Sequence, residues 1–324
     1  MLVPVLLFLL GFVLLIKGGD WFVDGAVGIA HRFHLSELLI GATVVSIGTT
    51  LPEVMVSSQA ALVGNSGISY GNAIGSVICN TSLISALTVA IRPTSVDRKS
   101  LRLPVAAFFL AAALYAGIAY TTGRFTRWNG VLLLCLFLAY IALTVSQMKK
   151  HPEGAAAAEE EEEPVKERPL WQELLMLVIG AAAIAFGAKL LVDNGTLIAA
   201  ALGVPDSVIG LTMVALGTSL PELVTAITAL VKKRSALSLG NIIGANLFNI
   251  VLVSGMAITI RPFAIPAEKT LAGMNASLLV DLPVMFLVMA LLCLPTLKEG
   301  KLKRWQGITL LCIYTAFTLF QFAV

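Results

Sequence analysis

The chain has 324 residues, of which 58% are hydrophobic and 13% are charged, and its formal net charge is +3. An ordinary soluble domain is about half apolar and a quarter charged, so this composition excludes a soluble fold. No basic stripe interleaved with aromatic residues is present, which argues against nucleic-acid binding. The four cysteines form no CxxC pair and the three histidines no HExxH pattern, so no disulfide framework, zinc site or cofactor is expected.

Ten apolar segments follow one another along the chain, each near or above the length that crosses a bilayer. The first continues past Gly18 and Gly19 to about Ala30 and has no basic residue before it. It is therefore interpreted as a transmembrane helix rather than a signal peptide. The predicted segments are 2–30, 37–62, 70–90, 102–120, 128–147, 170–198, 206–231, 239–260, 277–296 and 305–323. The first and sixth are longer than a perpendicular span requires and are expected to tilt.

An acidic stretch separates the fifth segment from the sixth. Glu159–Glu163 are five consecutive glutamates, which repel one another and cannot enter a bilayer. We interpret 148–169 as a solvated linker, and a calcium-sensing role for the glutamates is the less favoured alternative. The linker divides the chain into two predicted units of five helices each, 1–147 and 170–324.

Lysine and arginine are distributed unevenly between the loops. The loops after the first, third, fifth, seventh and ninth segments together carry sixteen of them, whereas the alternate loops carry four. Because cytoplasmic loops are enriched in Lys and Arg, we expect both termini to face outward and the acidic linker to be cytoplasmic. No organelle-targeting segment is evident, so the cell membrane is the expected location.

The two halves of the chain contain the same motifs. Gly41–Glu53 reads GATVVSIGTTLPE, and Gly210–Glu222 reads GLTMVALGTSLPE, at an offset of 169 residues. The same offset relates Asp24 to Asp193 and two G-N-x-x-G motifs to each other, with Asn72 in the first and Asn241 in the second. Further on, RWNG matches RWQG at an offset of 177, so the second half carries an insertion between its third and fifth helices.

Five helices per repeat is an odd number, so the second repeat must enter the membrane from the opposite side. This inverted arrangement is typical of secondary transporters, in which the substrate site lies near the membrane midplane where the repeats meet. The sequence therefore predicts an all-α integral membrane protein of ten transmembrane helices, arranged as two inverted five-helix repeats.

The second and seventh helices are expected to be broken at the motif G-T-[TS]-L-P-E. Pro52 and Pro221 lack an N–H group and clash with the carbonyl four residues earlier, so each frees a carbonyl within the membrane. A carbonyl freed at this depth must find water, protein or an ion as its partner. The neighbouring Thr-Thr and Thr-Ser pairs add hydroxyl oxygens.

Glu53 and Glu222 follow these prolines directly, and neither core motif contains a lysine or arginine. A carboxylate inside a membrane is costly and usually faces a partner or a cavity. If the repeats bring the two together, they must bind a cation or share a proton. Each glutamate is followed 27 residues later by an asparagine, Asn80 or Asn249. Carboxylate, carbonyl and hydroxyl oxygens suit Ca²⁺ or Na⁺, so a cation site is predicted here, although a proline kink or a GxxxG pattern alone is usually structural.

Through these duplicated motifs the sequence resembles the calcium/cation antiporter superfamily, and within it the prokaryotic sodium/calcium exchangers. The resemblance covers nearly the whole chain. It implies that Ca²⁺ is held by Glu53 and Glu222 together with the backbone carbonyls of Thr49 and Thr218. It also implies that Na⁺ uses the same glutamates and that the amides lie at the centre of the site. The further residues implied are Ser46, Thr50, Ser76, Ala215, Ser219, Asn80 and Asn249.

Two positions depart from the pattern of that family. Ala245 stands where the first repeat has Ser76 and offers no hydroxyl. Asn249 stands where some relatives carry an acid. The coupling ion and its stoichiometry therefore stay open at this point.

The favoured function is antiport of Ca²⁺ against Na⁺ by alternating access, with the first and sixth helices sliding or rocking against the rest. A proton-coupled or potassium-dependent exchanger is the alternative within transport. A passive channel is disfavoured by the proline-broken inverted repeats, and an intramembrane enzyme by the lack of a nucleophile–base pair. The expected partners are Ca²⁺, Na⁺ and the lipid bilayer, and both a monomer and a homo-oligomer are compatible with the sequence.

Overall fold

The computed structural model describes residues 2–150, 168–202, 217–267, 270–271 and 273–323. Nearly all of these residues are helical. The helices of the first half are α1 Leu2–Arg32, α2 Glu37–Ile40, α3 Ser46–Val63, α4 Ser66–Cys79, α5 Ala86–Ile91, α6 Arg98–Thr122 and α7 Arg127–Lys150. Two π-helical turns join parts of the same span, η1 Gly41–Val45 and η2 Asn80–Ser85.

The second half repeats this order. Its helices are α8 Leu170–Ala201, α11 Leu220–Val231, α12 Ser235–Phe248, α13 Ser254–Ile260, α14 Leu282–Glu299 and α15 Arg304–Ala323, with π-helical turns η5 Asn249–Val253 and η6 Ser277–Asp281. A two-stranded antiparallel hairpin, β1 Thr270–Leu271 and β2 Met274–Asn275, precedes η6. The hairpin lies in the connection 261–276, whereas 92–97 makes the matching connection in the first half. The predicted insertion is therefore confirmed and located.

Eight helical spans in the described ranges are long and apolar enough to cross a membrane. The seventh predicted segment is described only from Gly217 onward, where α11 is a shorter apolar helix, and α15 occupies the tenth. The prediction of an all-helical membrane protein is confirmed. The acidic run Glu159–Glu163 lies outside the described residues.

The two expected helix breaks take different forms. In the second span the chain stays helical through Pro52, and the irregularity is the π-helical turn Gly41–Val45 nearly two turns earlier. In the seventh span a turn at Thr218 and Ser219 precedes α11, and Pro221 lies in the first turn of that helix, where its missing N–H removes no helical bond.

The inverted relation of the two repeats is visible in two short backbone bridges. Ser95 pairs with Lys301, and Arg124 pairs with Ala264, both antiparallel. Adding 169 to Ser95 gives Ala264, and adding 177 to Arg124 gives Lys301, so each bridge is the repeat copy of the other. Each repeat thus ties the connection after its third span to the connection before the fifth span of the other repeat, as expected for two units related by a pseudo-two-fold axis.

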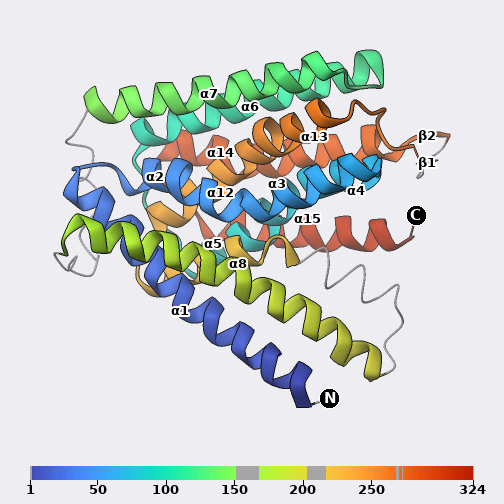
Figure 1. Ribbon diagram of the computed structural model, residues 1–324. Helices are drawn as coiled ribbons and strands as arrows, with labels where there is room; N and C mark the ends of the chain where they lie inside the picture. The colour runs from blue at the N-terminus through green and yellow to red at the C-terminus, as the bar shows by residue number, and fades with distance from the viewer. Residues whose placement is uncertain (1, 151–167, 203–216, 268–269, 272, 324) are drawn as a thin grey trace.

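The helices α1 and α8 form a long antiparallel pair on one side of the bundle, with α6 and α7 on the opposite side (Figure 1). The pair is held by glycines, since Gly11 of α1 lies against Gly187 of α8, and Gly18 lies against Gly180. By the repeat offset Gly11 corresponds to Gly180 and Gly18 to Gly187, so these contacts are again reciprocal. Small residues allow close approach of helices in a membrane, where packing drives association.

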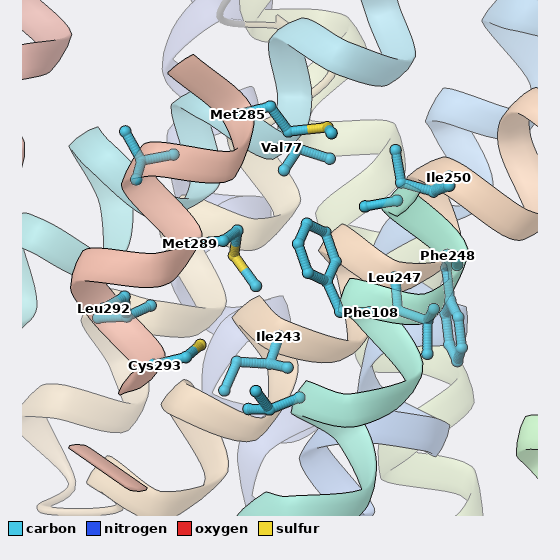
Figure 2. Close-up of a cluster of buried hydrophobic side chains, with 14 of the residues drawn as sticks. Val77, Phe108, Ile243, Leu247, Phe248, Ile250, Met285, Met289, Leu292 and Cys293 are labelled. Carbon is cyan, nitrogen blue, oxygen red and sulfur yellow. The ribbon is translucent and has the colours of Figure 1, made fainter. Parts of the chain in front are cut away.

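The main apolar core lies away from this pair. Figure 2 shows Phe108 of α6 among Val77 of α4, Ile243 of α12 and Met289 of α14, all four fully buried. Helices from both repeats supply this core, so neither repeat has a complete core of its own.

Replacing Gly180 by alanine tests the close packing of α1 and α8. A β-carbon there would lie 2.5 Å from the backbone nitrogen of Phe22, a contact that forces the helices apart. We expect Gly180→Ala to destabilise the protein by about 1–3 kcal/mol, in line with overpacked cores. Thermal unfolding in detergent measures this effect. Gly117→Ala on α6 is the matched control, because its β-carbon would meet nothing within 4 Å, and an equal loss in both variants would contradict this account.

Candidate functional site

Two glutamates lie in the interior of the helix bundle, one from each repeat. Glu53 follows Pro52 within α3, and Glu222 follows Pro221 in the first turn of α11. Both side chains are fully buried, and the two carboxyl groups are close enough for their charges to interact. Because α3 packs against α11, the structure brings both glutamates into the same interior region.

Two asparagines, also one from each repeat, open π-helical turns beside the glutamates. Asn80 begins η2 and Asn249 begins η5, and both are fully buried. The turn η2 packs against α11 and α12, and η5 packs against α3 and α4. Each turn therefore contacts helices of the other repeat. Single π-helical turns inside α-helices occur frequently at functional sites.

A serine at the end of a π-helical turn satisfies the first carbonyl of that turn. Ser46 Oγ donates to the Gly41 carbonyl at 2.7 Å, and Ser254 Oγ donates to the Asn249 carbonyl at 3.0 Å, both five residues back. In a π-helical turn the backbone hydrogen bonds span five residues instead of four. The serine hydroxyl stabilises this wider turn by donating a hydrogen bond to its first carbonyl.

The structure places nearly all of the predicted site residues in the interior. Thr218 is half-buried, and Ala215 lies outside the described residues. The remaining predicted residues are each at most 3% exposed: Ser46, Thr49, Thr50, Glu53, Ser76, Asn80, Ser219, Glu222 and Asn249.

Many polar atoms of this group have no hydrogen-bond partner within the part of the chain that the structure describes. They are both carboxylate oxygens of Glu53 and of Glu222, both amide atoms of Asn80 and of Asn249, and the hydroxyls of Thr50 and Ser219. Buried polar groups in proteins are nearly always paired, and an isolated buried carboxylate is far more costly than a neutral group. Such a cluster indicates a partner that the described part of the chain does not supply.

The donor set is composed of oxygen atoms. Carboxylate, amide and hydroxyl oxygens are the ligands that hard cations such as Ca²⁺ prefer. No group of three or more His, Cys, Asp or Glu able to hold a metal is found among the described residues, in keeping with a site that has two carboxylates and is otherwise neutral.

Asn241 is a buried residue of this region that was not among the predicted site residues. Its Oδ1 accepts from Thr49 Oγ1 at 3.2 Å, and its backbone carbonyl accepts from Ser46 Oγ at 2.9 Å. It therefore holds two predicted ligands of the first repeat from a helix of the second. The one signal in the sequence is that Asn241 has a repeat copy, Asn72, within the duplicated G-N-x-x-G motif.

Asn72 makes different contacts, and one substitution between the repeats accounts for one of them. Asn72 Nδ2 donates to the Glu53 carbonyl at 3.1 Å and to Ser57 Oγ at 2.8 Å. The repeat copy of Ser57 is Ala226, which has no hydroxyl. Asn241 accordingly lacks that acceptor, and its Nδ2 has no partner among the described residues.

The chain matches a known family over most of its length. The family model described as "Sodium/calcium exchanger protein" matches residues 3–146 and 173–323. The chain belongs to the sodium/calcium exchanger family. This is a family of membrane transporters, which agrees with the expectation that the protein is not an enzyme.

Individual relatives support this assignment. The sodium/calcium exchanger MaX1 of Methanosarcina acetivorans is 32% identical over 98% of this chain and 98% of its own. An uncharacterised membrane protein of Methanocaldococcus jannaschii is 39% identical over 95% of this chain and 94% of its own. Among solved structures, the sodium-calcium exchanger NCX_Mj, soaked with Na⁺ and Sr²⁺, matches with a TM-score of 0.81 at 36% identity, covering 97% of both chains.

The contact between Asn241 and Thr49 can be tested with Ca²⁺ as the probe ion of this family. We expect Asn241→Ala to weaken Ca²⁺ binding several-fold, because Thr49 loses the acceptor that fixes its hydroxyl. Calorimetric titration of the purified protein measures the dissociation constant. In a Thr49→Val background the same substitution should have little further effect, since contacting residues are energetically coupled. Full additivity of the two substitutions would rule out a role of Asn241 through Thr49.

Proposed function

We propose that the protein is a secondary active antiporter that exchanges Ca²⁺ for Na⁺ across the cell membrane by alternating access. Membership of the sodium/calcium exchanger family supports cation antiport involving Ca²⁺. The sodium coupling and the binding site are part of the proposal. The observation that carries it is the pair of fully buried carboxylates, Glu53 and Glu222, whose oxygens have no partner within the described structure.

The proposed Ca²⁺ ligands are the two carboxylates together with the backbone carbonyls of Thr49 and Thr218. Ca²⁺ takes six to eight oxygen ligands in flexible geometries, and its double charge balances two carboxylates. The unpartnered amides of Asn80 and Asn249 complete the oxygen-rich surroundings.

Na⁺ is proposed to occupy the same region in place of Ca²⁺. Its additional oxygens come from hydroxyls and carbonyls of Ser46, Thr50, Ser76, Ala215 and Ser219. Ser46 and Thr49 donate their hydroxyl protons to groups of α12 or of their own helix, so their oxygen lone pairs stay available for a cation.

The same charges account for obligatory exchange. An empty site would carry two uncompensated negative charges through the low-dielectric interior, which is strongly unfavourable. A site neutralised by cations avoids this cost. The carrier therefore changes its open side readily only when it is loaded, which couples the movement of one ion to that of the other.

The helices α1 and α8 are the proposed moving elements. They pack far more extensively on each other than either packs on any other described element. The bridges Ser95–Lys301 and Arg124–Ala264, by contrast, connect spans that belong to the rest of the bundle. A pair that is internally tight and loosely attached can slide or rock as one body.

The proposed orientation follows from the charges of the loops. Both termini face outward, and the linker 148–169 between the two five-helix units 1–147 and 170–324 lies in the cytoplasm. Proton coupling is the second candidate, because two neighbouring buried carboxylates can also bind protons.

Reconstitution of the purified protein into liposomes tests the proposal. We expect an outward Na⁺ gradient to drive Ca²⁺ uptake, and we expect Glu53→Gln or Glu222→Gln to reduce the uptake at least tenfold by removing one of the two charges. Glu299→Gln is the matched control, because Glu299 is an exposed residue at the end of α14 and pairs with Lys303.

Each outcome of this experiment decides between the candidates. Uptake that follows a proton gradient and ignores Na⁺ would replace the coupling ion and keep the site. Uptake that requires K⁺ in addition to Na⁺ would identify a potassium-dependent exchanger. Unchanged uptake in both site variants would exclude the proposed site.

A further inference from the structure

A lysine at the end of α11 directs its amino group entirely toward α1. Lys232 Nζ lies 2.5 Å from Asp24 Oδ1 and 3.4 Å from Asp20 Oδ1. It also donates to the backbone carbonyl of Asp20 at 3.1 Å. The side chains of Lys232 and Asp24 are 22% and 33% exposed, so this pair is partly shielded from solvent.

The chain segment that leads into α8 joins the same cluster. Arg168 Nη2 lies 3.5 Å from Asp24 Oδ2. Close by, Arg32 at the end of α1 pairs with the buried Glu173 of α8, at 3.1 Å between Nε and Oε2. The ends of α1 and α8 are thus connected to each other and, through Lys232, to α11.

The cluster is mechanically connected to the candidate ion site. Lys232 follows Glu222 by ten residues along the helical rise of α11, a distance of about 15 Å. Between them α1 touches α11 directly, since a β-carbon on Gly19 would lie 2.6 Å from Thr228 Oγ1. Separating α1 from α11 at this end therefore requires the ion pairs to break.

The opposite end of the helix pair has no such connection among the described residues. The repeat copy of Asp24 is Asp193 on α8, but the copy of Lys232 is Val63, a residue that is 77% exposed. Asp193 instead pairs with Lys189 of its own helix at 2.8 Å, on a largely exposed surface. The two repeats thus differ at the position of Lys232, which links the helix pair to the bundle, and at the position of Asp20, whose repeat copy is Lys189.

We propose that Asp20, Asp24, Arg168 and Lys232 form a one-sided latch that holds α1 against α11 and keeps the ion site closed on the side of Lys232. This inference rests on the proposed function and goes beyond it, because it states which side the empty carrier favours. In the predicted orientation the latch is cytoplasmic, so the carrier rests open to the outside. A mechanism with two symmetric ends would have no such preference.

Breaking the latch should change ion access on the two faces in opposite directions. The apparent affinity for an ion depends on the fraction of carriers that face it. We expect Lys232→Met to lower the half-saturating Ca²⁺ concentration on the Lys232 side several-fold and to raise it on the other side. Ca²⁺ uptake into right-side-out and inside-out membrane vesicles measures the two values separately.

Two further variants control for the charge itself. Lys232→Arg keeps a positive charge beside Asp20 and Asp24 and should leave both values near those of the unmodified protein. Lys189→Met breaks the pair within α8 and should leave both unchanged. Equal changes on both faces in Lys232→Met, or shifts of the same size in Lys232→Arg, would overturn the latch.

The repeat relation provides a second test, on the other side of the membrane. Val63→Lys places a lysine at the position that corresponds to Lys232, opposite Asp193 in a state closed on that side. Because a latch there favours the state that is open on the Lys232 side, we expect this variant to shift the two half-saturating concentrations in the same sense as Lys232→Met. A shift in the reverse sense would contradict a latch that acts through the α1–α8 pair.

Hydrogen–deuterium exchange of the purified protein separates failure of the latch from failure of the proposed function. We expect the peptides that cover residues 17–30 of α1 to exchange faster in Lys232→Met and at the original rate in Lys232→Arg, whether or not Ca²⁺ is transported. Unchanged exchange in Lys232→Met would reject the latch even if transport is confirmed.

Discussion

The structure depends on a single electrostatic constraint, the burial of two carboxylates inside an apolar helix bundle in which no described basic side chain pairs with them. Glu53 and Glu222 are fully buried and have no partner among the described residues. Folding such a bundle is tolerable only if the charges are neutralised, and under the proposed function the neutralising partner is the transported cation. The amide atoms of Asn80 and Asn249 also have no hydrogen-bond partner among the described residues. The groups that are costly to bury are therefore the same groups that the proposal assigns to ion binding.

Inverted duplication explains how one chain assembles this site. Each repeat contributes one glutamate and one asparagine at equivalent positions, and both backbone bridges run between the repeats. The glycine contacts of α1 with α8 follow the same reciprocal rule. Alternating access requires two conformations of similar energy, and a structure made of two copies with opposite orientation supplies them by exchanging the roles of its halves. Under the proposed latch, differences between the copies, such as Lys232 against Val63, determine which of the two is favoured.

Much of this organisation could be predicted from the sequence because it rests on local patterns. Apolar length identified the spans, and the 169-residue offset identified the repeats and paired Glu53 with Glu222. The form of the helix irregularities could not be predicted. The effect of proline follows from local steric clashes, which the sequence shows. The π-helical turn Gly41–Val45 instead depends on a serine hydroxyl and on packing against α12, which only the tertiary structure shows. The roles of Asn241 and Lys232 were missed for a related reason. Their partners lie about 190 to 210 residues away in the sequence, and only the tertiary fold brings them together.

The reciprocity of the two backbone bridges has a consequence for the ancestry of the fold. Because each bridge is the repeat copy of the other, the interface between the halves is isologous: the same patch on each half meets its counterpart on the other. A half-length precursor that entered the membrane in both orientations would already have possessed this interface and could have assembled as an antiparallel homodimer. Fusion of two such genes would have added no new contact to the frame. Fusion would instead have allowed the sequences of the two halves to diverge. Ala226 now stands at the position that corresponds to Ser57, and Lys232 stands at the position that corresponds to Val63.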